Sequence, residues 1–406
     1  MYQGPLRYIY NMKNNFHTDN KKRILYIYPY FSLDSKKGAE QLDILAGIEI
    51  LKKVNNIDIT TITIDLKNRT IISDINYPEN RISISIIFSY IKFLVIKYTT
   101  FDNAMRQAFT YRNYSLVKNI VRSNKIDIII TNTTSTVLFG INQKAKHFFR
   151  SVCYEPIYVF GAINGRIITR IHSFLKYLSV HKELRSDVLF AISPRDAIYY
   201  KKHFKYIKRK PILEVLPLRQ FHRILPLKTY NKNSTRLNIG FLGSTYNVLH
   251  NKKSLDFIVN DVANNLKNIE GVVFNIYGSK LPNVKSVHHN IVNHNWVESI
   301  EEIYSYNDVF LAPNFLPSGM QSKVFEPMLF GKVLICDTES LSGFNFITNV
   351  EYLHAASATE FANKIIWVKE NIEESKKLAL FGYKKAFEII GPSAIQKQLE
   401  FINPKP

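Results

Sequence analysis

The chain has 406 residues and carries 54 Lys and Arg against 33 Asp and Glu, for a formal net charge of +21. Its 46% hydrophobic and 13% aromatic content is typical of a globular protein and excludes a disordered one. This length exceeds what one hydrophobic core usually holds, so we expect two domains. Cys153 and Cys336 lie far apart in apolar runs, which argues for a reducing compartment and against a disulfide framework or a zinc site.

The positive charge favours an anionic partner: nucleic acid, an anionic membrane face or a phosphate-bearing substrate. An AT-rich genome would also enrich Ile, Asn and Lys, which weakens that argument. The polar, lysine-bearing start of the chain does not predict a signal peptide. The most apolar segment, Ile82–Ile96, is interrupted by Lys92 and is too short to span a bilayer.

Short apolar runs of strand length alternate with segments of helical period along the chain. The predicted strands are Ile24–Tyr28, Ile59–Ile64, Ile126–Thr131, Val188–Ile192, Leu237–Leu242, Val272–Tyr277, Val309–Ala312 and Lys332–Cys336. Most of these runs are continuously hydrophobic, as in parallel strands buried on both faces. The helix-period segments include Gly38–Lys53, which has one apolar face. The pattern predicts an α/β protein with open, doubly wound parallel sheets.

The alternation occurs twice, so we expect two Rossmann-like domains that face a cleft at the carboxyl ends of their strands. The first domain is placed at residues 23–226, after an N-terminal tail of residues 1–22. A polar linker, LKTYNKNSTR, covers residues 227–236. The second domain follows at residues 237–385, and residues 386–406 are expected to form a C-terminal helix or tail that packs back on the first domain.

Two strands of the second domain end in glycine, at Gly243-Ser244 and at Gly278. Glycine lets the backbone approach a ligand, and the N–H groups at the start of a following helix suit a phosphate. Lys252 and Lys253 lie at the start of the helix predicted after the first of these strands and could reach a diphosphate. The alternative is an ordinary strand-to-helix turn with solvated lysines.

The stretch Pro317–Asp337, PSGMQSKVFEPMLFGKVLICD, leads from a strand through a loop of small and polar residues into a short helix. The backbone N–H groups of Gly319–Gln321 could hold a diphosphate, and Lys323 could add positive charge. Glu326, one helical turn on, could accept hydrogen bonds from ribose hydroxyls. Alternatively, Glu326 is a solvated carboxylate paired with Lys323 at i, i+3. Pro327 predicts a late helix start or a kink.

This stretch resembles the donor loop of the retaining GT-B glycosyltransferases of family 4, also called glycosyl transferases group 1. In that family a strand ending in proline leads through a glycine-bearing loop to a helix with a glutamate and a closing glycine. The matching residues here are Pro313, Gly319, Glu326, Gly331 and Asp337. The loop is most similar to the subgroup written G-S-G-I-K-V-K-V-L-E, read here as residues 317–326.

The resemblance extends over most of the chain. The opening RILYIYPYF…GAEQ is similar to the family's first strand and acceptor-side loop, with Gly38 at its glycine. The segments RSDVLFAISPR, NIGFLGS and FNIYGS are similar to three further strand ends of the family. The segment NHNWVE lies where the family has a loop that contacts the base, which makes Trp296 and Val297 candidates.

The resemblance implies transfer of a sugar, with retention, from a nucleotide-diphosphate sugar to a glycan or lipid-linked acceptor in polysaccharide or glycoconjugate assembly. It assigns the donor ribose to Glu326 and the diphosphate to the loop of Ser318, Gly319, Met320 and Gln321. Ser318 stands where the family has the first of two glutamates. The segment at residues 151–155 lacks the family's histidine, and Glu155 is the catalytic candidate there, with a loop carboxylate as the alternative.

The sequence has no Asp-x-Asp tripeptide and no Cys and His cluster with ligand spacing, so we expect no metal and no other cofactor. Lysines, backbone N–H groups and a helix N-terminus would then meet the charge of the leaving diphosphate. His172 and His181, on helix-period segments, are interpreted as structural or exposed.

On the acceptor side, the segment Tyr199–Pro211, YYKKHFKYIKRKP, mixes aromatic residues with basic side chains, among which we count His203. Together with Ile82–Ile96 it predicts docking on an anionic membrane face, where each cation contributes about 1 kcal/mol. The alternatives are a core segment and a solvated helix end. We therefore expect a cytoplasmic protein on the membrane surface that binds no nucleic acid. The rival hypotheses are a basic nucleic-acid-binding protein and a GT-B protein that is an epimerase or not catalytic.

Overall fold

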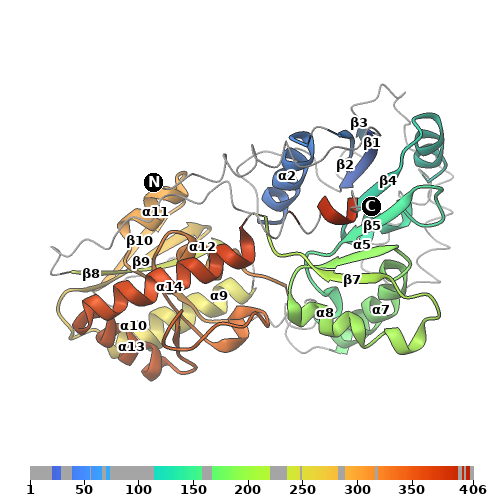
Figure 1. Cartoon of the computed structure of the whole chain (residues 1–406). Coiled ribbons are helices and arrows are strands. Elements are labelled where there is room, and N and C mark those ends of the chain that lie inside the picture. The colour runs from blue at the N-terminus through green and yellow to red at the C-terminus, as the bar shows by residue number, and fades with distance from the viewer. Residues whose placement is uncertain are drawn as a thin grey trace.

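The computed structural model describes residues 21–28, 39–54, 56–65, 70–73, 114–157, 167–219, 236–246, 249–281, 289–315, 319–391, 396 and 399–402. These residues form two α/β units that lie side by side (Figure 1). The first unit contains the strands up to residue 215, and the second contains those from residue 237. Gly38, Ser318 and Ile82–Ile96 lie outside the described residues, as does the predicted linker up to residue 235.

The first unit is built on a seven-stranded sheet of order β3-β2-β1-β4-β5-β6-β7. Its strands are β1 (Lys22–Tyr28), β2 (Ile57–Asp65), β3 (Thr70–Ser73), β4 (Ile128–Asn132), β5 (Lys146–Arg150), β6 (Val188–Ala191) and β7 (Ile212–Val215). Its helices are α2 (Ala39–Lys52), an unlabelled helix at 114–123, α5 (Thr133–Thr136), η1 (Val137–Phe139), α7 (Ile167–Glu183), α8 (Pro194–Lys201) and η2 (Phe204–Tyr206). The β2–β3 pair is antiparallel and the other pairs are parallel.

The second unit is built on a six-stranded parallel sheet of order β10-β9-β8-β11-β12-β13. Its strands are β8 (Leu237–Thr245), β9 (Val272–Ser279), β10 (Ile291–Asn295), β11 (Val309–Ala312), β12 (Val333–Cys336) and β13 (Leu353–His354). Its helices are α9 (Leu249–Asp256), the π-helical η4 (Phe257–Val262), α10 (Ala263–Asn265), α11 (Ile300–Tyr306), α12 (Ser322–Leu329), η5 (Thr338–Leu341), α13 (Ala358–Glu370) and α14 (Ile372–Ile390).

The prediction of two doubly wound sheets is confirmed, and each of the eight predicted strands is present. Five further strands were not predicted: β3, β7 and β13 have four residues or fewer, and polar side chains interrupt β5 and β10. Strand β10 reads IVNHN and has mostly exposed side chains, as suits its place at the edge of a sheet. The helix α12 begins at Ser322 with Pro327 in its interior, so the late start, one of the two outcomes expected from this proline, does not occur.

One apolar core joins the two units. It combines β1 and β6 of the first sheet with α12 and α14 of the second unit. The ring of Phe401, near the C-terminus, packs edge-on against Phe190 of β6 at 5.6 Å between centroids. Burial of such large side chains contributes roughly 1.5–3 kcal/mol each. The last described residues therefore lie against the first sheet (Figure 1).

A buried cluster of three charged side chains connects Arg219, at the end of the first unit, to Asp43 of α2 and Arg150 of β5. Arg219 donates to Asp43 on α2 at 2.9 Å, and Arg150, at the end of β5, donates to the same carboxylate at 3.3 Å and to Pro217 O at 2.9 Å. Burial would raise the pKa of Asp43, but the two guanidinium groups hold it well below its usual range. Gly47 makes room for this cluster, because a Cβ there would lie 2.2 Å from Arg219 Nη1.

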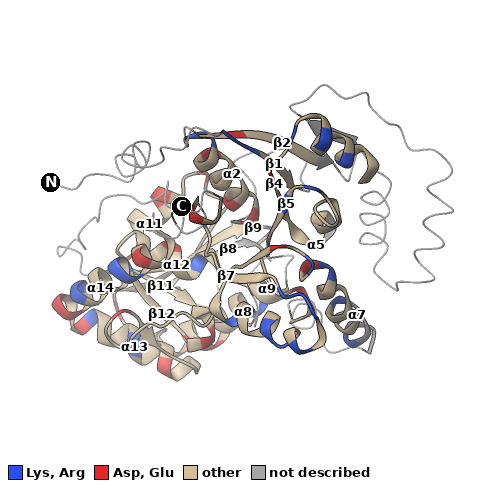
Figure 2. Cartoon of the chain, turned by 45° about the vertical axis from the view of Figure 1, so that its right-hand side comes forward, with Lys and Arg blue, Asp and Glu red and all other residues tan. Residues whose placement is uncertain are grey.

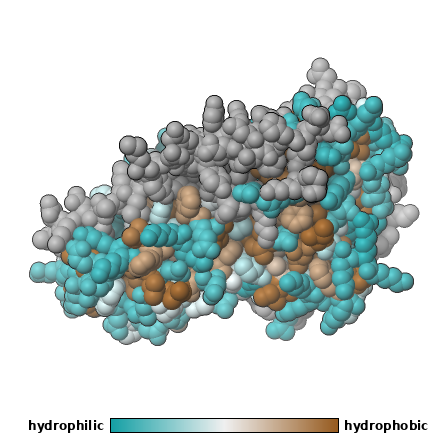
Figure 3. Space-filling view, in the orientation of Figure 1, coloured by the Kyte–Doolittle hydropathy of each residue, from teal (hydrophilic) through white to brown (hydrophobic). Residues whose placement is uncertain are grey.

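Among the described helices, none is long and apolar enough to cross a membrane. Hydrophilic residues line much of the rim in Figure 3, and apolar residues show between them on both units.

Candidate functional site

The loop after β11 in the second unit contacts the loop after β6 in the first. The backbone N–H of Gly319 donates to Asp196 Oδ2 at 3.1 Å. Asp196 is fully buried in the first turn of α8, where its own N–H donates to the Ser193 hydroxyl at 3.1 Å. Gly319 has φ +79, and a Cβ on it would lie 3.3 Å from Cys153 Cβ. The predicted diphosphate loop therefore lies against the 151–155 segment, which carries the catalytic candidate Glu155.

A second pair of loops reinforces this contact between the units. Ser342 Oγ donates to Gly319 O at 2.7 Å, and the Arg195 N–H donates to Ser342 O at 3.2 Å. The Arg195 guanidinium pairs with Glu339 at 2.8 Å. Gly343, with φ +82, leaves space that a Cβ would fill at 2.9 Å from Arg195 N. The carboxyl ends of β6, β11 and β12 are thus held together across the two units.

Lys323 lies in the first turn of α12 and is half-buried. Its Nζ donates to Asn251 Oδ1 at 3.4 Å and lies 5.2 Å from the centre of the Phe241 ring. Burial lowers the pKa of Lys323 to about 8, although Asp337 opposes this shift. The amine therefore still carries its charge at neutral pH. Its residue belongs to the first turn of a helix, where backbone N–H groups lack the usual acceptor within the helix. This combination suits an anionic ligand.

Glu326 is buried, at 3% exposure, so the alternative of a solvated helix carboxylate is wrong. Its Oε2 accepts a hydrogen bond from the Tyr304 hydroxyl at 2.8 Å. The Tyr304 ring stacks on Phe330 with centroids 4.3 Å apart, which fixes the position of this hydroxyl. Lys323 donates to Asn251 and does not form the pair with Glu326 at i, i+3 that this alternative implied.

The two glycine-ended strands of the second unit meet. A Cβ on Gly278, which has φ +141, would lie 1.8 Å from Gly243 O. The ring of Tyr246 covers both glycines, and its hydroxyl donates to Tyr277 O at 2.7 Å. Close packing therefore explains why both positions are glycine. Nothing is described of the Ser244 side chain.

The helix α9 starts at Leu249, earlier than expected, and brings His250 and Asn251 close to Lys323. Asn251 Nδ2 donates to Thr245 O at 3.0 Å. Burial, and secondarily the charge of Lys323, lowers the pKa of His250 to about 4, so its imidazole is neutral. Within the described part of the chain, the buried His250 Nδ1 has no hydrogen-bond partner. The sequence analysis missed His250, although its place just after a glycine-ended strand is a usable signal.

The remaining donor-side candidates differ in exposure. Lys252 is exposed and Lys253 half-buried on α9. Trp296 is 49% exposed in the loop after the edge strand β10, whereas Val297 packs against the Tyr277 and Tyr304 cluster. In the sheet, β9 and β8 separate β10 from β11, which precedes the Gly319 loop.

Two loop residues near α12 have structural contacts. The side chain of Met320 is part of the apolar core that joins the two units. Gln321 precedes α12, and its Nε2 donates to Asn314 Oδ1 at 2.6 Å.

Glu155, the catalytic candidate of the first unit, forms an ion pair with Lys176 of α7. Nearby, Glu183 accepts from Thr134 Oγ1 at 2.5 Å and from the Tyr200 hydroxyl at 2.6 Å. Burial, and secondarily the charge of Glu155, raises the pKa of Glu183 to about 7. Glu155 therefore lies close enough to the buried Glu183 for its charge to raise the pKa of that carboxyl group.

The basic run Tyr199–Pro211 lies on the surface of the first unit, where Figure 2 shows Lys and Arg along α7 and α8. Counting His203 among the basic side chains of this run was wrong, because His203 is fully buried and burial lowers its pKa to about 4. The exposed basic residues of the run are Lys201, Lys202, Lys205, Lys208, Arg209 and Lys210. Tyr206, at 60% exposure, lies among them. His181 packs edge-on against the His203 ring, and nothing is described of the His172 side chain.

In the described ranges, no three His, Cys, Asp or Glu side chains are grouped so that they could hold a metal ion.

Comparison with known proteins places the second unit in a described family. Residues 236–371 match the family Glycosyl transferases group 1. The matched range includes Lys323, Glu326 and His250. No curated protein sequence matches the chain. The chain therefore carries a glycosyltransferase domain.

Solved structures resemble the chain over both units. A glycosyltransferase from Rickettsia africae is 14% identical with a TM-score of 0.62, covering 95% of this chain and 100% of that one. Anabaena HepE in complex with UDP is 11% identical with a TM-score of 0.59, covering 94% and 100%. S. aureus TarM in complex with fondaparinux, alpha-GlcNAc-glycerol and UDP is 11% identical with a TM-score of 0.53, covering 72% of this chain. The match spans 59% of the length of that TarM chain. These similarities establish a GT-B fold.

Proposed function

We propose that the chain transfers a sugar from a nucleoside-diphosphate sugar to a glycan or lipid-linked acceptor in polysaccharide or glycoconjugate assembly. The observation that carries this proposal is the position of Lys323. Within the matched glycosyltransferase domain, this charged and partly desolvated amine lies at the N-terminus of α12, beside the loop that contacts the first unit.

In this proposal, Lys323, His250 and the first N–H groups of α12 bind the diphosphate. A neutral imidazole can donate one N–H to a phosphate oxygen, and the helix N-terminus favours negative charge. The same groups would stabilise the charge that develops on the leaving diphosphate, with no metal ion. The loop at Gly319 would exchange its hydrogen bond to Asp196 for one to the ligand as the donor binds.

Glu326 would accept hydrogen bonds from the ribose, and the ring of Trp296 would contact the base. The sugar would then face the segment at 151–155, with Glu155 as its nearest candidate for chemistry. Retention of configuration follows from the family resemblance of the donor loop and is part of the proposal. Ser318 replaces the usual first glutamate, so the contacts to the sugar differ from those of the family at that position.

The acceptor side is proposed to dock on an anionic membrane surface through the run Tyr199–Pro211. Six exposed basic side chains and the exposed ring of Tyr206 support this, because cations near an anionic surface contribute about 1 kcal/mol each. A lipid-linked acceptor would be reached from such a surface.

The test is a thermal-shift screen of UDP, UDP-glucose and GDP against the wild type, Lys323→Met and the control Lys377→Met, an exposed lysine of α14. UDP is included because HepE and TarM were solved with it. A responding donor should raise the melting temperature of the wild type and the control but not of Lys323→Met. Product analysis with membrane lipid extracts then separates transfer from epimerisation. Tight binding of nucleic acid without any nucleotide response would contradict the proposal.

A further inference from the structure

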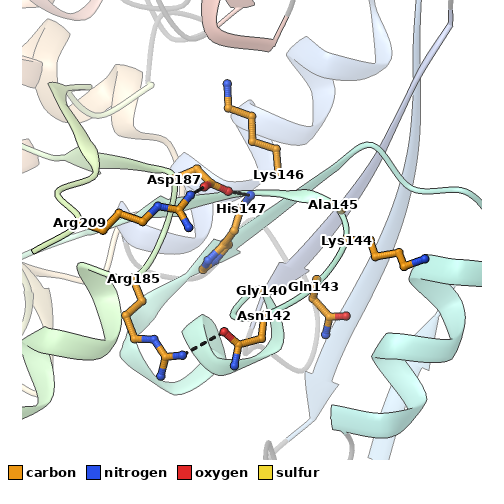
Figure 4. A pocket seen from close by; sticks show the side chains of 10 residues that line it. All are labelled: Gly140, Asn142, Gln143, Lys144, Ala145, Lys146, His147, Arg185, Asp187 and Arg209. Atoms are coloured by element: carbon orange, nitrogen blue, oxygen red, sulfur yellow. Dashed lines mark hydrogen bonds and ion pairs between the residues drawn. The ribbon is translucent and has the colours of Figure 1, made fainter.

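A second polar site lies at the opposite edge of the first sheet, where β5, β6 and β7 begin. It is a pocket of 660 Å³ (Figure 4). Lys146 is the first residue of β5, Asp187 directly precedes β6, and Arg209 lies in the turn before β7. The Gly319 contact, by contrast, is made at the carboxyl ends of the strands. The pocket is therefore separate from the candidate donor site.

The pocket is strongly cationic. Lys144, Lys146, Arg185 and Arg209 line it, against the single carboxylate of Asp187. That carboxylate is already engaged, because it pairs with Arg209 and accepts the backbone N–H of His147 at 2.8 Å. The side chains of Arg185 and Arg209 lie on the side of the His147 ring, whereas those of Lys144 and Lys146 point away from it (Figure 4). Two cations beside a concave surface attract anions more strongly than scattered ones.

A buried imidazole forms part of the wall. His147 is 2% exposed, and its Nε2 lies 2.8 Å from Thr131 Oγ1. Its Nδ1 has no hydrogen-bond partner within the described residues. Burial lowers the pKa of His147 to about 4, so the ring is neutral at pH 7 and presents one N–H. If the Thr131 hydroxyl donates to Nε2, that N–H is on Nδ1.

The wall is shaped to hold this ring. A Cβ on Gly140 would lie 2.1 Å from the His147 ring, so only glycine leaves the imidazole in place. Asn142 Oδ1 accepts from Arg185 at 3.0 Å, which fixes the position of the guanidinium (Figure 4). A buried N–H without an acceptor costs free energy unless a ligand or water supplies one.

We propose that this pocket binds a phosphate ester, with Arg185 and Arg209 neutralising the phosphate and His147 Nδ1–H donating to one of its oxygens. The volume exceeds that of a bare phosphate and lies in the range of pockets that hold small molecules. The side-chain amides of Asn142 and Gln143 can hydrogen-bond hydroxyl groups of the esterified polyol. The ester could be a soluble sugar phosphate or a lipid headgroup, since Arg209 belongs to the exposed basic run.

The test measures binding of inorganic phosphate and glycerol 1-phosphate by calorimetry, and of phosphatidylglycerol vesicles by flotation, with phosphatidylcholine vesicles as the neutral reference. The variant Arg185→Gln/Arg209→Gln removes the two pocket cations on the side of His147. The control Lys267→Gln/Lys377→Gln removes two exposed cations of the second unit. We expect about tenfold or greater loss of affinity in the pocket variant only, since charged hydrogen bonds are lost there.

A second variant tests the imidazole. Gly140→Ala keeps every cation but displaces the His147 ring. Cooperative melting of this variant shows that it is folded, and its affinity for phosphate should then be lower than that of the wild type. In the wild type, the ¹⁵N signal of His147 Nδ1 should shift on phosphate binding. Binding of soluble phosphates identifies a soluble ligand, and variant-sensitive binding to phosphatidylglycerol vesicles alone identifies a lipid headgroup. Absence of both kinds of binding, an equal loss in the control, or an unmoved His147 signal would overturn the proposal.

Discussion

The backbone N–H of Gly319, in the second unit, donates to the carboxylate of Asp196, in the first, at 3.1 Å. The N–H proposed to bind the donor diphosphate is thus occupied by a carboxylate of the other unit. An anionic ligand would compete with Asp196 for this donor, so donor binding and the contact between the units are linked.

Gly319→Ala is expected to destabilise the protein. A non-glycine residue at φ +79 is strained, and the added Cβ would lie 3.3 Å from Cys153 Cβ. Backbone strain of this kind costs about 1–3 kcal/mol. The free energy of unfolding, from urea denaturation, measures this cost. Ser322→Ala, three residues on and at the start of α12, is the control and should change it by much less. Equal stability of Gly319→Ala and wild type would contradict the described loop.

UDP affinity is expected to fall as the pH rises through 8. The pKa of Lys323 is lowered to about 8, so the amine is charged below that pH and neutral above it. Lys323→Arg keeps the charge throughout, because a guanidinium does not lose its proton in this range. The measurement is the dissociation constant of UDP between pH 7 and 9 for both proteins. If Lys323→Arg shows the same decline as wild type, Lys323 does not provide the charge that binds the diphosphate.

The parts of the fold that could be predicted are those with local signals. Runs such as Ile24–Tyr28 are continuously apolar, so each can be predicted as a strand from its own residues, without knowing which strand it pairs with. The strand β5 was missed because Lys146, His147 and Arg150 interrupt it. Arg150 is tolerated inside because Asp43, 107 residues away, compensates its charge. A partner so distant in the sequence leaves no local pattern.

The same distinction applies to the candidate site. The spacing of Gly319, Lys323 and Glu326, together with the resemblance to the family's donor loop, marked them as one group of candidates. It could not reveal Asp196 or Tyr304, because their hydrogen bonds to Gly319 and Glu326 depend on how loops far apart in the chain meet.

The buried cluster of Asp43, Arg150 and Arg219 gives a large stability effect to test. Asp43→Ala leaves two buried guanidinium groups without their carboxylate, and breaking a buried ion pair costs about 3–5 kcal/mol. The control is Asp58→Ala, which removes an exposed carboxylate 3.7 Å from Lys21, an interaction of about 1 kcal/mol or less. Urea denaturation of both variants measures the difference. A loss in Asp43→Ala no greater than in the control would contradict the described cluster.

Glu183 predicts a pH dependence of stability. Its pKa is raised from 4.5 to about 7 in the folded protein, so between these values the folded state binds a proton that the unfolded state releases. Its contribution to stability is therefore fully present below pH 4.5 and is lost as the pH rises through 7. Glu183→Gln cannot titrate, and its amide can still hydrogen-bond Thr134 and Tyr200. Relative to this variant, wild type should lose free energy of unfolding from pH 5 to pH 8 in urea denaturation. Parallel pH profiles of the two proteins would show that Glu183 is ionised in the folded state and that the described network does not hold its proton.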